Sequence, residues 1–321
     1  MKKKIFACII LLTLCLSLLA GCGSGKDKEG DNNPNTPDIP AEYVEPTFTR
    51  LDIEISDEPI YPVYHHDFVI KVNVPWNTVT VYTVDGSGNE TPIKAFVCST
   101  AREGCETPLG EFYLGEWYEW CYMADGTWGQ YAFRIIDGVY NDIMFHSVPY
   151  FEEDNSTLEW EDYNKLGDVA SLGCIRMCLR DVMWLCSNVG VYDYDDDTYT
   201  PVIIYADESS PGPLGKPEPC FIPDIDEVKG WDPTDPVSRN PWHTYDFSFA
   251  IENSITVEAS DSASVNWSRY LTAVDVYGND VSVYAKDNGG YDLSAKGTYL
   301  TTVKLSIGPL TATKDVYVIV K

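Results

Sequence analysis

Residues 171–176 read Ser-Leu-Gly-Cys-Ile-Arg and begin the segment with the clearest helical periodicity in the chain. Apolar side chains recur after them at helical spacing, which predicts a helix over residues 174–189. A cysteine that follows a glycine at the start of a helix lies where partial positive charge and free backbone N–H groups favour the thiolate. The same N–H groups can hold a developing oxyanion. This stretch therefore makes Cys174 a candidate nucleophile.

A histidine suited to act with Cys174 is found upstream. The chain has histidines at positions 65, 66, 146 and 243, and His146 ends the apolar run Ile143-Met144-Phe145-His146. A cysteine and a histidine are the minimal set for thiol acyl transfer, because the imidazole takes the thiol proton and returns it to the leaving amine. The alternative interpretation is a buried structural cysteine and a hydrogen-bonded core histidine.

The sequence around this pair is rich in short strand signals. Alternating or β-branched runs bounded by turn residues predict strands at 68–74, 79–81, 93–97, 131–136, 142–146 and 201–205. Only one or two helices are expected among them. We therefore predict a mainly β fold for residues 67–206.

The first residues have the pattern of a processing signal. Met1 to Lys4 is basic, Ile5 to Leu19 is an apolar run too short for a stable transmembrane helix, and Leu19-Ala20-Gly21-Cys22 resembles a bacterial lipobox. We expect residues 1–21 to be a lipoprotein signal peptide and the Cys22 thiol to be acylated. The alternative is an ordinary secretory signal with a chance cysteine. Residues 22–66, rich in Gly, Asn, Asp and Pro, are interpreted as a lipid-anchored tether.

The C-terminal part divides into a linker and a second domain. Residues 207–243 contain eight prolines, which predicts a semi-rigid linker rather than a regular element. Short strands at nearly even spacing over residues 244–321 predict a small β-sandwich. Residues 271–280 and 297–299 give this region a loose resemblance to the immunoglobulin-like (Ig-like) modules of bacterial surface proteins.

Charge excludes some classes of partner. The chain has 321 residues, with 22 Lys and Arg against 50 Asp and Glu, a formal net charge of −28. Nucleic-acid binding needs a cationic face for phosphates, so this excess of acid argues against it. The same sign argues against electrostatic docking on anionic lipid, so only the lipid anchor is expected to hold the protein at a membrane. Nothing in the sequence indicates an oligomer.

The cysteines leave several arrangements open. Seven follow Cys22, which allows one free nucleophile with up to three disulfides, or seven free thiols. Cys98 and Cys105 flank a predicted loop and are the first candidates for a pair. Cys174 and Cys178 have the spacing of helical metal ligands, but no second Cys/His cluster completes a zinc site. We expect neither a metal nor another cofactor.

Three features together resemble the YkuD-type L,D-transpeptidase catalytic domain. They are residues 171–176, the upstream His146, and Thr107-Pro108-Leu109-Gly110-Glu111-Phe112, in the order found in that family. The resemblance covers about residues 67–206. It implies a small β-sandwich-like domain whose active site lies under a flap, and it places the aromatics at 117–128 in that flap.

The resemblance also implies residue roles. Cys174 matches the nucleophile and His146 the base, while the main-chain carbonyl of Ser147 would orient the imidazole. The N–H groups of Gly173 and Cys174 match the oxyanion hole. Arg176 would either stabilise the loop or bind a substrate carboxylate. Further candidates for contact with the substrate or the loop are Ser171 and Tyr131.

This sequence departs from the family pattern in two ways. Leu172 stands where the motif has a histidine, and His146 and Cys174 are 28 positions apart, longer than the usual interval. The excess lies in residues 149–163, which are rich in acids and aromatics. We favour a solvated surface loop for them, the alternative being a wall on the acceptor side of the cleft.

The implied reaction is acyl transfer in the cell wall, outside the cytoplasm. Cys174 would attack the carbonyl of the third residue of a peptidoglycan tetrapeptide stem and expel D-Ala. The amine of a second stem would then take the acyl group and form a 3→3 cross-link. Water as acceptor would give L,D-carboxypeptidase activity, and a protein amine would give protein anchoring. The alternative from another class is a non-catalytic, wall-binding surface lipoprotein.

Overall fold

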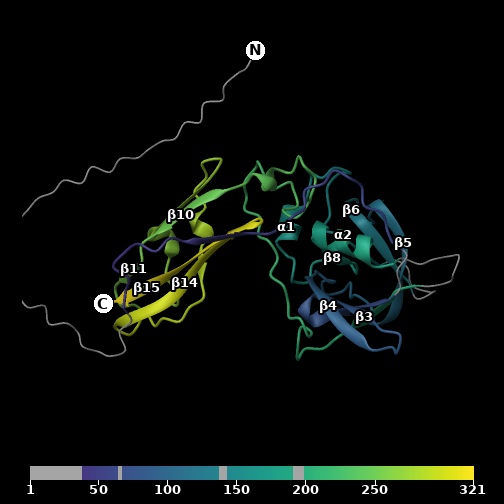
Figure 1. The fold of residues 1–321 in the computed structure, drawn as a ribbon, viewed down its shortest axis with the longest axis horizontal. Coiled ribbons are helices and arrows are strands. Elements are labelled where there is room, and N and C mark those ends of the chain that lie inside the picture. Colours follow the sequence, from purple (N-terminus) through teal and green to yellow (C-terminus); the bar gives the residue numbers. More distant parts are fainter. Residues whose placement is uncertain (1–37, 64–66, 137–142, 191–198) are drawn as a thin grey trace, which may run out of the picture. The chain divides into compact units, whose positions relative to one another are not determined.

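The computed structural model describes residues 38–63, 67–136, 143–190 and 199–321. The described chain is mainly β, with two short α-helices, which confirms the predicted fold class (Figure 1). The predicted signal peptide and the lipidation site at Cys22 lie outside the described residues. No helix in the described part of the chain is long and apolar enough to cross a membrane.

The sheet of the N-terminal half has the strand order β4-β3-β2-β9-β5-β6-β7-β8. Its strands are β2 (Phe68–Asn73), β3 (Thr78–Val84), β4 (Glu90–Val97), β5 (Gly110–Tyr122), β6 (Trp128–Ile136), β7 (Ile143–Ser147), β8 (Ile175–Met177) and β9 (Pro201–Tyr205). Strands β2 and β9 pair in parallel, as do β7 and β8, and the other pairs are antiparallel. The six predicted strands are therefore present, whereas β5 and β8 were not predicted as strands.

Helix α2 (Leu179–Asn188) covers one face of this sheet and contacts β6 and β7. It buries Val182 and Leu185 against apolar side chains such as Phe133 and Phe145. The predicted helix over 174–189 is wrong at its start, because residues 175–177 form strand β8. Ile175 and Met177 are fully buried, and pairing with β7 satisfies their backbone, so the parallel ladder prevails over helical propensity there.

Residues 149–163 are folded, which corrects the solvated loop that we favoured. They include the short helix α1 (Trp160–Tyr163), and Tyr150, Leu158 and Tyr163 are almost fully buried. These side chains belong to one apolar cluster with Ile222 and Trp242 of the proline-rich linker. Tyr150, Leu158 and Tyr163 of the insertion therefore pack with the linker, whereas Phe151 is 64% exposed.

The proline-rich linker also binds the start of α2. The Asp232 carboxylate accepts a 2.8 Å hydrogen bond from the Leu179 N–H, and the Thr234 hydroxyl accepts one of 3.1 Å from the Arg180 N–H. Asp232 is completely buried, and Cys178 at the N-cap makes no capping bond of its own. A residue some 50 positions downstream thus caps this helix.

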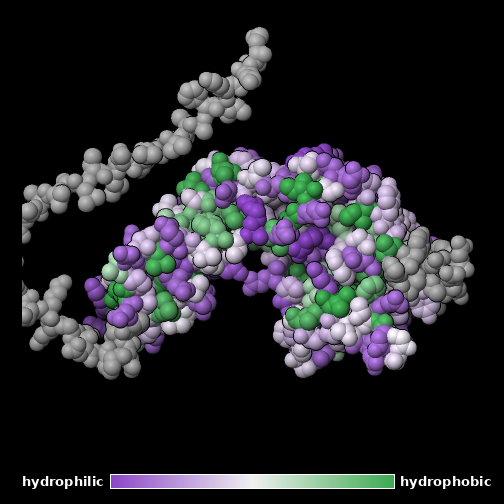
Figure 2. All heavy atoms as spheres, in the orientation of Figure 1, coloured by the Kyte–Doolittle hydropathy of each residue, from purple (hydrophilic) through white to green (hydrophobic). Residues whose placement is uncertain are grey.

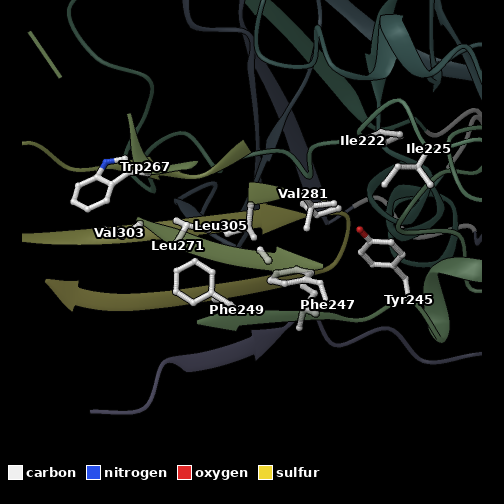
Figure 3. Close-up of a cluster of buried hydrophobic side chains, with 14 of the residues drawn as sticks. Ile222, Ile225, Tyr245, Phe247, Phe249, Trp267, Leu271, Val281, Val303 and Leu305 are labelled. Atoms are coloured by element: carbon white, nitrogen blue, oxygen red, sulfur yellow. The ribbon is translucent and has the colours of Figure 1, made fainter. Parts of the chain in front are cut away.

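Residues 244–321 form two small sheets around a separate part of the core. Strands β10 (Phe247–Ile251) and β12 (Leu271–Asp275) pair with each other, and the second sheet contains β11 (Ser254–Val257), β13 (Lys286–Asp287), β14 (Gly297–Ile307) and β15 (Leu310–Val320). Figure 3 shows Phe247 and Phe249 of β10 beside Val303 and Leu305 of β14. Two sheets with a shared core agree with the predicted sandwich, and the immunoglobulin-like assignment stays a prediction. Short 3-10 turns lie at Val74–Trp76, Pro241–His243, Trp267–Arg269 and Ser282–Tyr284.

The end of the predicted tether is not a free coil. Residues Thr47–Arg50 form strand β1, which pairs with β15, and the Arg50 side chain donates to the Trp242 and Tyr245 carbonyls. The Val63 N–H donates to the Cys186 carbonyl of α2. All four β1 residues are exposed, so the strand has no apolar alternation from which to predict it. The many acidic residues keep the visible surface largely hydrophilic, with apolar patches between (Figure 2).

Candidate active site

Strands β7 and β8 bring the candidate nucleophile and base together. They pair in parallel with His146 opposite Arg176, and Cys174 immediately precedes β8. Successive side chains of a strand alternate between faces, so His146, Arg176 and Cys174 share one face while Phe145 and Ile175 point to the core on the other. The partly exposed Cys174 thiol is also hydrogen-bonded to the Met144 backbone.

The imidazole of His146 is fixed by the residue that follows it. Its Nδ1 atom lies 2.6 Å from the carbonyl oxygen of Ser147, and the side chain is only 2% exposed. A carbonyl only accepts hydrogen bonds, so Nδ1 carries the proton and Nε2 is the free base. The Ser147 hydroxyl accepts from the Gln130 N–H at 2.8 Å and donates to the Val148 carbonyl at 2.9 Å. These two bonds hold the backbone of Ser147 in place.

Gly129 of β6 lies directly against the same ring. A Cβ atom at this position would come within 2.9 Å of His146 Nδ1, 3.2 Å of His146 Cβ and 2.5 Å of Met123 Cε. Those distances are closer than van der Waals contact, so only glycine leaves the imidazole where it is. Sequence reasoning missed Gly129, because the need for a missing side chain arises only from the packing.

The loop before Cys174 is held by hydrogen bonds of its own. The Ser171 hydroxyl donates to the Cys174 carbonyl at 2.6 Å and accepts from the Gly173 N–H at 3.2 Å, and Ser171 is buried. Gly173 has φ of +132°, a conformation that favours glycine. Ser171 therefore belongs to the loop structure. The Gly173 N–H, which the resemblance places in the oxyanion hole, is already bonded to Ser171.

Thr107 supports the same loop from another direction. Its hydroxyl donates to the Gly173 carbonyl at 2.9 Å and accepts from the Ala101 N–H at 3.1 Å, in a buried position. The stretch Thr107-Pro108-Leu109-Gly110 was noted in the sequence, but its role was not inferred. Leu172, which replaces the motif histidine, is 47% exposed, and Leu109 is 58% exposed. Both side chains are therefore directed to solvent.

Arg176 is engaged by acidic side chains. Its guanidinium pairs with Asp162 of α1 at 2.6 Å and with Asp125 of the β5–β6 turn at 3.7 Å, and the residue is 6% exposed. These contacts favour the loop-structure role over the binding of a substrate carboxylate. The two carboxylates were not identified from the sequence, because the turn and the insertion meet Arg176 only in the folded chain.

Tyr131 is placed away from this face. Its ring lies in the core cluster with Phe133, 6.2 Å from the Trp117 ring, and its hydroxyl is hydrogen-bonded to the Ile60 backbone. Burial raises its pKa to about 12. The suggestion that Tyr131 contacts the substrate is therefore wrong for this structure, because a left-handed backbone (φ 47°) and apolar packing direct it inward.

Electrostatics favour the uncharged forms of Cys174 and His146, the candidate pair. Burial raises the pKa of the Cys174 thiol, although the Met144 backbone bond and the Arg176 charge oppose the increase. Burial, and then the positive charge of Arg176, lower the pKa of His146 to about 3. The expected thiolate at a helix N-terminus is corrected: α2 begins at Leu179, and Asp232 and Thr234 occupy its first N–H groups. Thiol and imidazole are therefore both neutral near pH 7.

The other cysteines among the described residues are free thiols, including Cys98 and Cys105, so the suggested pair is not formed. Over the described ranges there is no grouping of three or more His, Cys, Asp or Glu side chains able to hold a metal ion. Two cavities of about 330 and 400 Å³ are present, and neither is lined by Cys174 or His146.

The sequence of this domain is similar to those of known proteins. Residues 67–204 match the model of the YkuD family, described as the L,D-transpeptidase catalytic domain. The chain is 26% identical over 198 residues to YciB of Bacillus subtilis (strain 168), whose name assigns it provisionally to the L,D-transpeptidases; the match covers 59% of this chain and 95% of that protein.

Solved structures are similar over part of the chain. An L,D-transpeptidase from Mycobacterium smegmatis is 19% identical with a TM-score of 0.33, over 44% of this chain and 59% of that one. One from Mycobacterium tuberculosis H37Rv is 21% identical with a TM-score of 0.32, over 43% of this chain and 57% of that one. The present chain thus spans less than two thirds of each. Residues 67–204 are thus similar to the YkuD-type L,D-transpeptidase catalytic domain.

Proposed function

We propose that this domain is a cysteine acyltransferase of the cell wall. The Cys174 thiol attacks the carbonyl of residue 3 in a peptidoglycan tetrapeptide stem, forms a thioester and expels D-Ala as the free amine. The acceptor amine of a second stem then attacks the thioester, which gives a 3→3 cross-link and regenerates the thiol. The observation that carries the proposal is the bond between His146 Nδ1 and Ser147 O, which leaves Nε2 unprotonated on the face shared with Cys174.

The neutral pair defines how the proton moves. Since the thiol is not ionised beforehand, His146 Nε2 takes its proton as the sulfur attacks, and then gives that proton to the departing D-Ala nitrogen. The Cys174 N–H is the proposed donor to the oxyanion. The Gly173 N–H joins it only if the oxyanion replaces the Ser171 hydroxyl as its acceptor.

The location follows from the N-terminal residues. We propose that signal cleavage leaves Cys22 as the lipidated N-terminus, so that the protein faces the cell wall from the outer side of the membrane. Residues 22–37 then separate the anchor from the first described residues. The substrate is the peptide stem of peptidoglycan, and no metal takes part in the proposed steps.

A carbapenem tests the nucleophile directly, because it acylates an active thiol without a second substrate. The purified protein is incubated with imipenem and its mass is measured. We expect one adduct, mapped to Cys174, that is lost in Cys174→Ala and in His146→Ala but kept in Cys220→Ala, a control thiol in the linker. An unmodified protein with a titratable Cys174 thiol would instead favour the wall-binding lipoprotein.

Muropeptide analysis separates the possible acceptors. In cells that carry Cys174→Ala, loss of 3→3 dimers supports the transpeptidase. A changed ratio of tetrapeptide to tripeptide stems with unchanged dimers supports the L,D-carboxypeptidase. Loss of a wall-linked protein with both of these unchanged supports protein anchoring.

A further inference from the structure

Arg176 occupies an unusual position for a fully charged side chain. It is 6% exposed and lies directly opposite His146 in the β7–β8 register, two residues after Cys174. Its Nε atom is buried and has no hydrogen-bond partner among the described residues. A guanidinium this close to a catalytic base acts on the base through its charge, because screening by water is weak in a buried site.

Two elements distant in sequence fix that charge in place. Asp162 of α1 accepts from one terminal nitrogen at 2.6 Å, and Asp125 of the β5–β6 turn lies 3.7 Å from the other. Asp125 is itself held by the Thr127 hydroxyl at 2.7 Å. The guanidinium cannot rotate away from His146 without breaking these contacts, so its position is set by the insertion and by the hairpin turn together.

We propose, building on the proposed function, that Arg176 is a positioning residue that keeps the His146 imidazole neutral, so that Nε2 stays free to accept a proton. A proton on Nε2 would bring a second positive charge beside the buried guanidinium, which raises the free energy of the imidazolium. The neutral ring is the form that accepts the thiol proton. Arg176 thereby keeps the base available at acid pH, and it needs no contact with the substrate.

The charged and titratable groups around His146 have opposing effects. Arg176 of β8 lowers its pKa, while Asp125 of the β5–β6 turn and the bond to the Ser147 carbonyl raise it. From β6 the ring meets Gly129, which is uncharged. Cys174, next to β8, is neutral at the same pH because burial raises its pKa. Burial and Arg176 together prevail and bring the pKa of His146 to about 3.

The test is an NMR titration of the His146 ring nitrogens in the purified protein, which needs no substrate and no activity. In the unaltered protein we expect a neutral, Nδ1-protonated ring from pH 8 down to about pH 4. In Arg176→Gln we expect a titration midpoint about one to two pH units higher, because removal of a nearby like charge has effects of that size. Arg176→Lys, which keeps the charge, should restore the lower midpoint.

Two further variants separate charge from folding. Arg180→Gln removes a neighbouring arginine that pairs with Asp181, and it should leave the His146 midpoint unchanged. Asp125→Asn removes a carboxylate and should not raise the His146 midpoint. This variant also tests the charges around His146 if Arg176→Gln fails to fold. An equal midpoint in Arg176→Gln and the unaltered protein, or a rise in Asp125→Asn, overturns the proposal. Failure of the imipenem adduct with the titrations as expected would reject the acyl-transfer function and leave this role intact.

Discussion

The Nδ1 atom of His146 lies 2.6 Å from the main-chain carbonyl of Ser147, the next residue in the chain. This bond uses the only N–H proton of the neutral imidazole, so Nε2 is left as an acceptor. It also explains how a histidine at the end of an apolar strand is buried with its Nδ1 atom hydrogen-bonded. One local contact thus sets both the tautomer and the direction of the base.

Alkylation of Cys174 should report a neutral thiol. Burial raises its pKa above the ordinary value of about 8.5, so the rate with iodoacetamide should climb steadily from pH 6 to pH 9. The rate is followed by mass spectrometry of the peptide that contains Cys174. A plateau between pH 6 and pH 8 would reveal a thiolate–imidazolium pair and contradict the electrostatics described above.

Gly129→Ala should damage catalysis more than folding. The new methyl group would lie 2.9 Å from His146 Nδ1, and moving the ring breaks its alignment with Cys174. We expect the rate of imipenem acylation to fall roughly 10²-fold or more, the contribution of a well-placed general base. Gly86→Ala is the matched control, because nothing lies within 4 Å of its added Cβ. Equal rates in the two variants would show that the ring tolerates the methyl group.

Thr107→Val should loosen the loop that presents the nucleophile. The substitution keeps the side-chain shape but leaves the Ala101 N–H and the Gly173 carbonyl without their partner. We expect a loss of about 1–3 kcal/mol in the free energy of unfolding, measured by urea denaturation, and slower acylation. The exposed Thr256→Val on β11 should change stability by less than about 0.5 kcal/mol. Unchanged unfolding of Thr107→Val would mean that water replaces the hydroxyl.

Asp232→Asn should change the pH dependence of stability. Burial raises the pKa of Asp232 to about 6 in the folded protein, above its unfolded value near 3.9. The folded state therefore binds more protons between these values, and the contribution of this group to stability falls as pH rises from about 4 to 6. The unfolding free energy of the unaltered protein minus that of Asp232→Asn should decrease over this interval by about 3 kcal/mol. A constant difference from pH 4 to pH 7 would mean that Asp232 is ionised throughout.

Which strands and helix ends could be predicted from the sequence has physical reasons. Strands β2, β3, β6 and β9 were predicted from alternating or β-branched apolar runs, although only β9 buries strictly alternate residues. The helix start was misplaced because residues 175–177 have apolar side chains compatible with either structure, and only their pairing with β7 decides between them. Strand β1 gave no signal, since all its side chains are exposed and only its backbone is paired.

The sequence alone identified the candidate residues: a cysteine after Ser-Leu-Gly, a histidine at the end of an apolar strand, and the order that matches the YkuD catalytic domain. Those features are local, and residue type and spacing are enough to show them. The tertiary structure decided the burial of His146, the ion pairs of Arg176, the need for a glycine at 129, and the capping of α2 by Asp232. Each of these depends on burial and on groups distant along the chain, and both are created only when the strands, the insertion and the linker pack together.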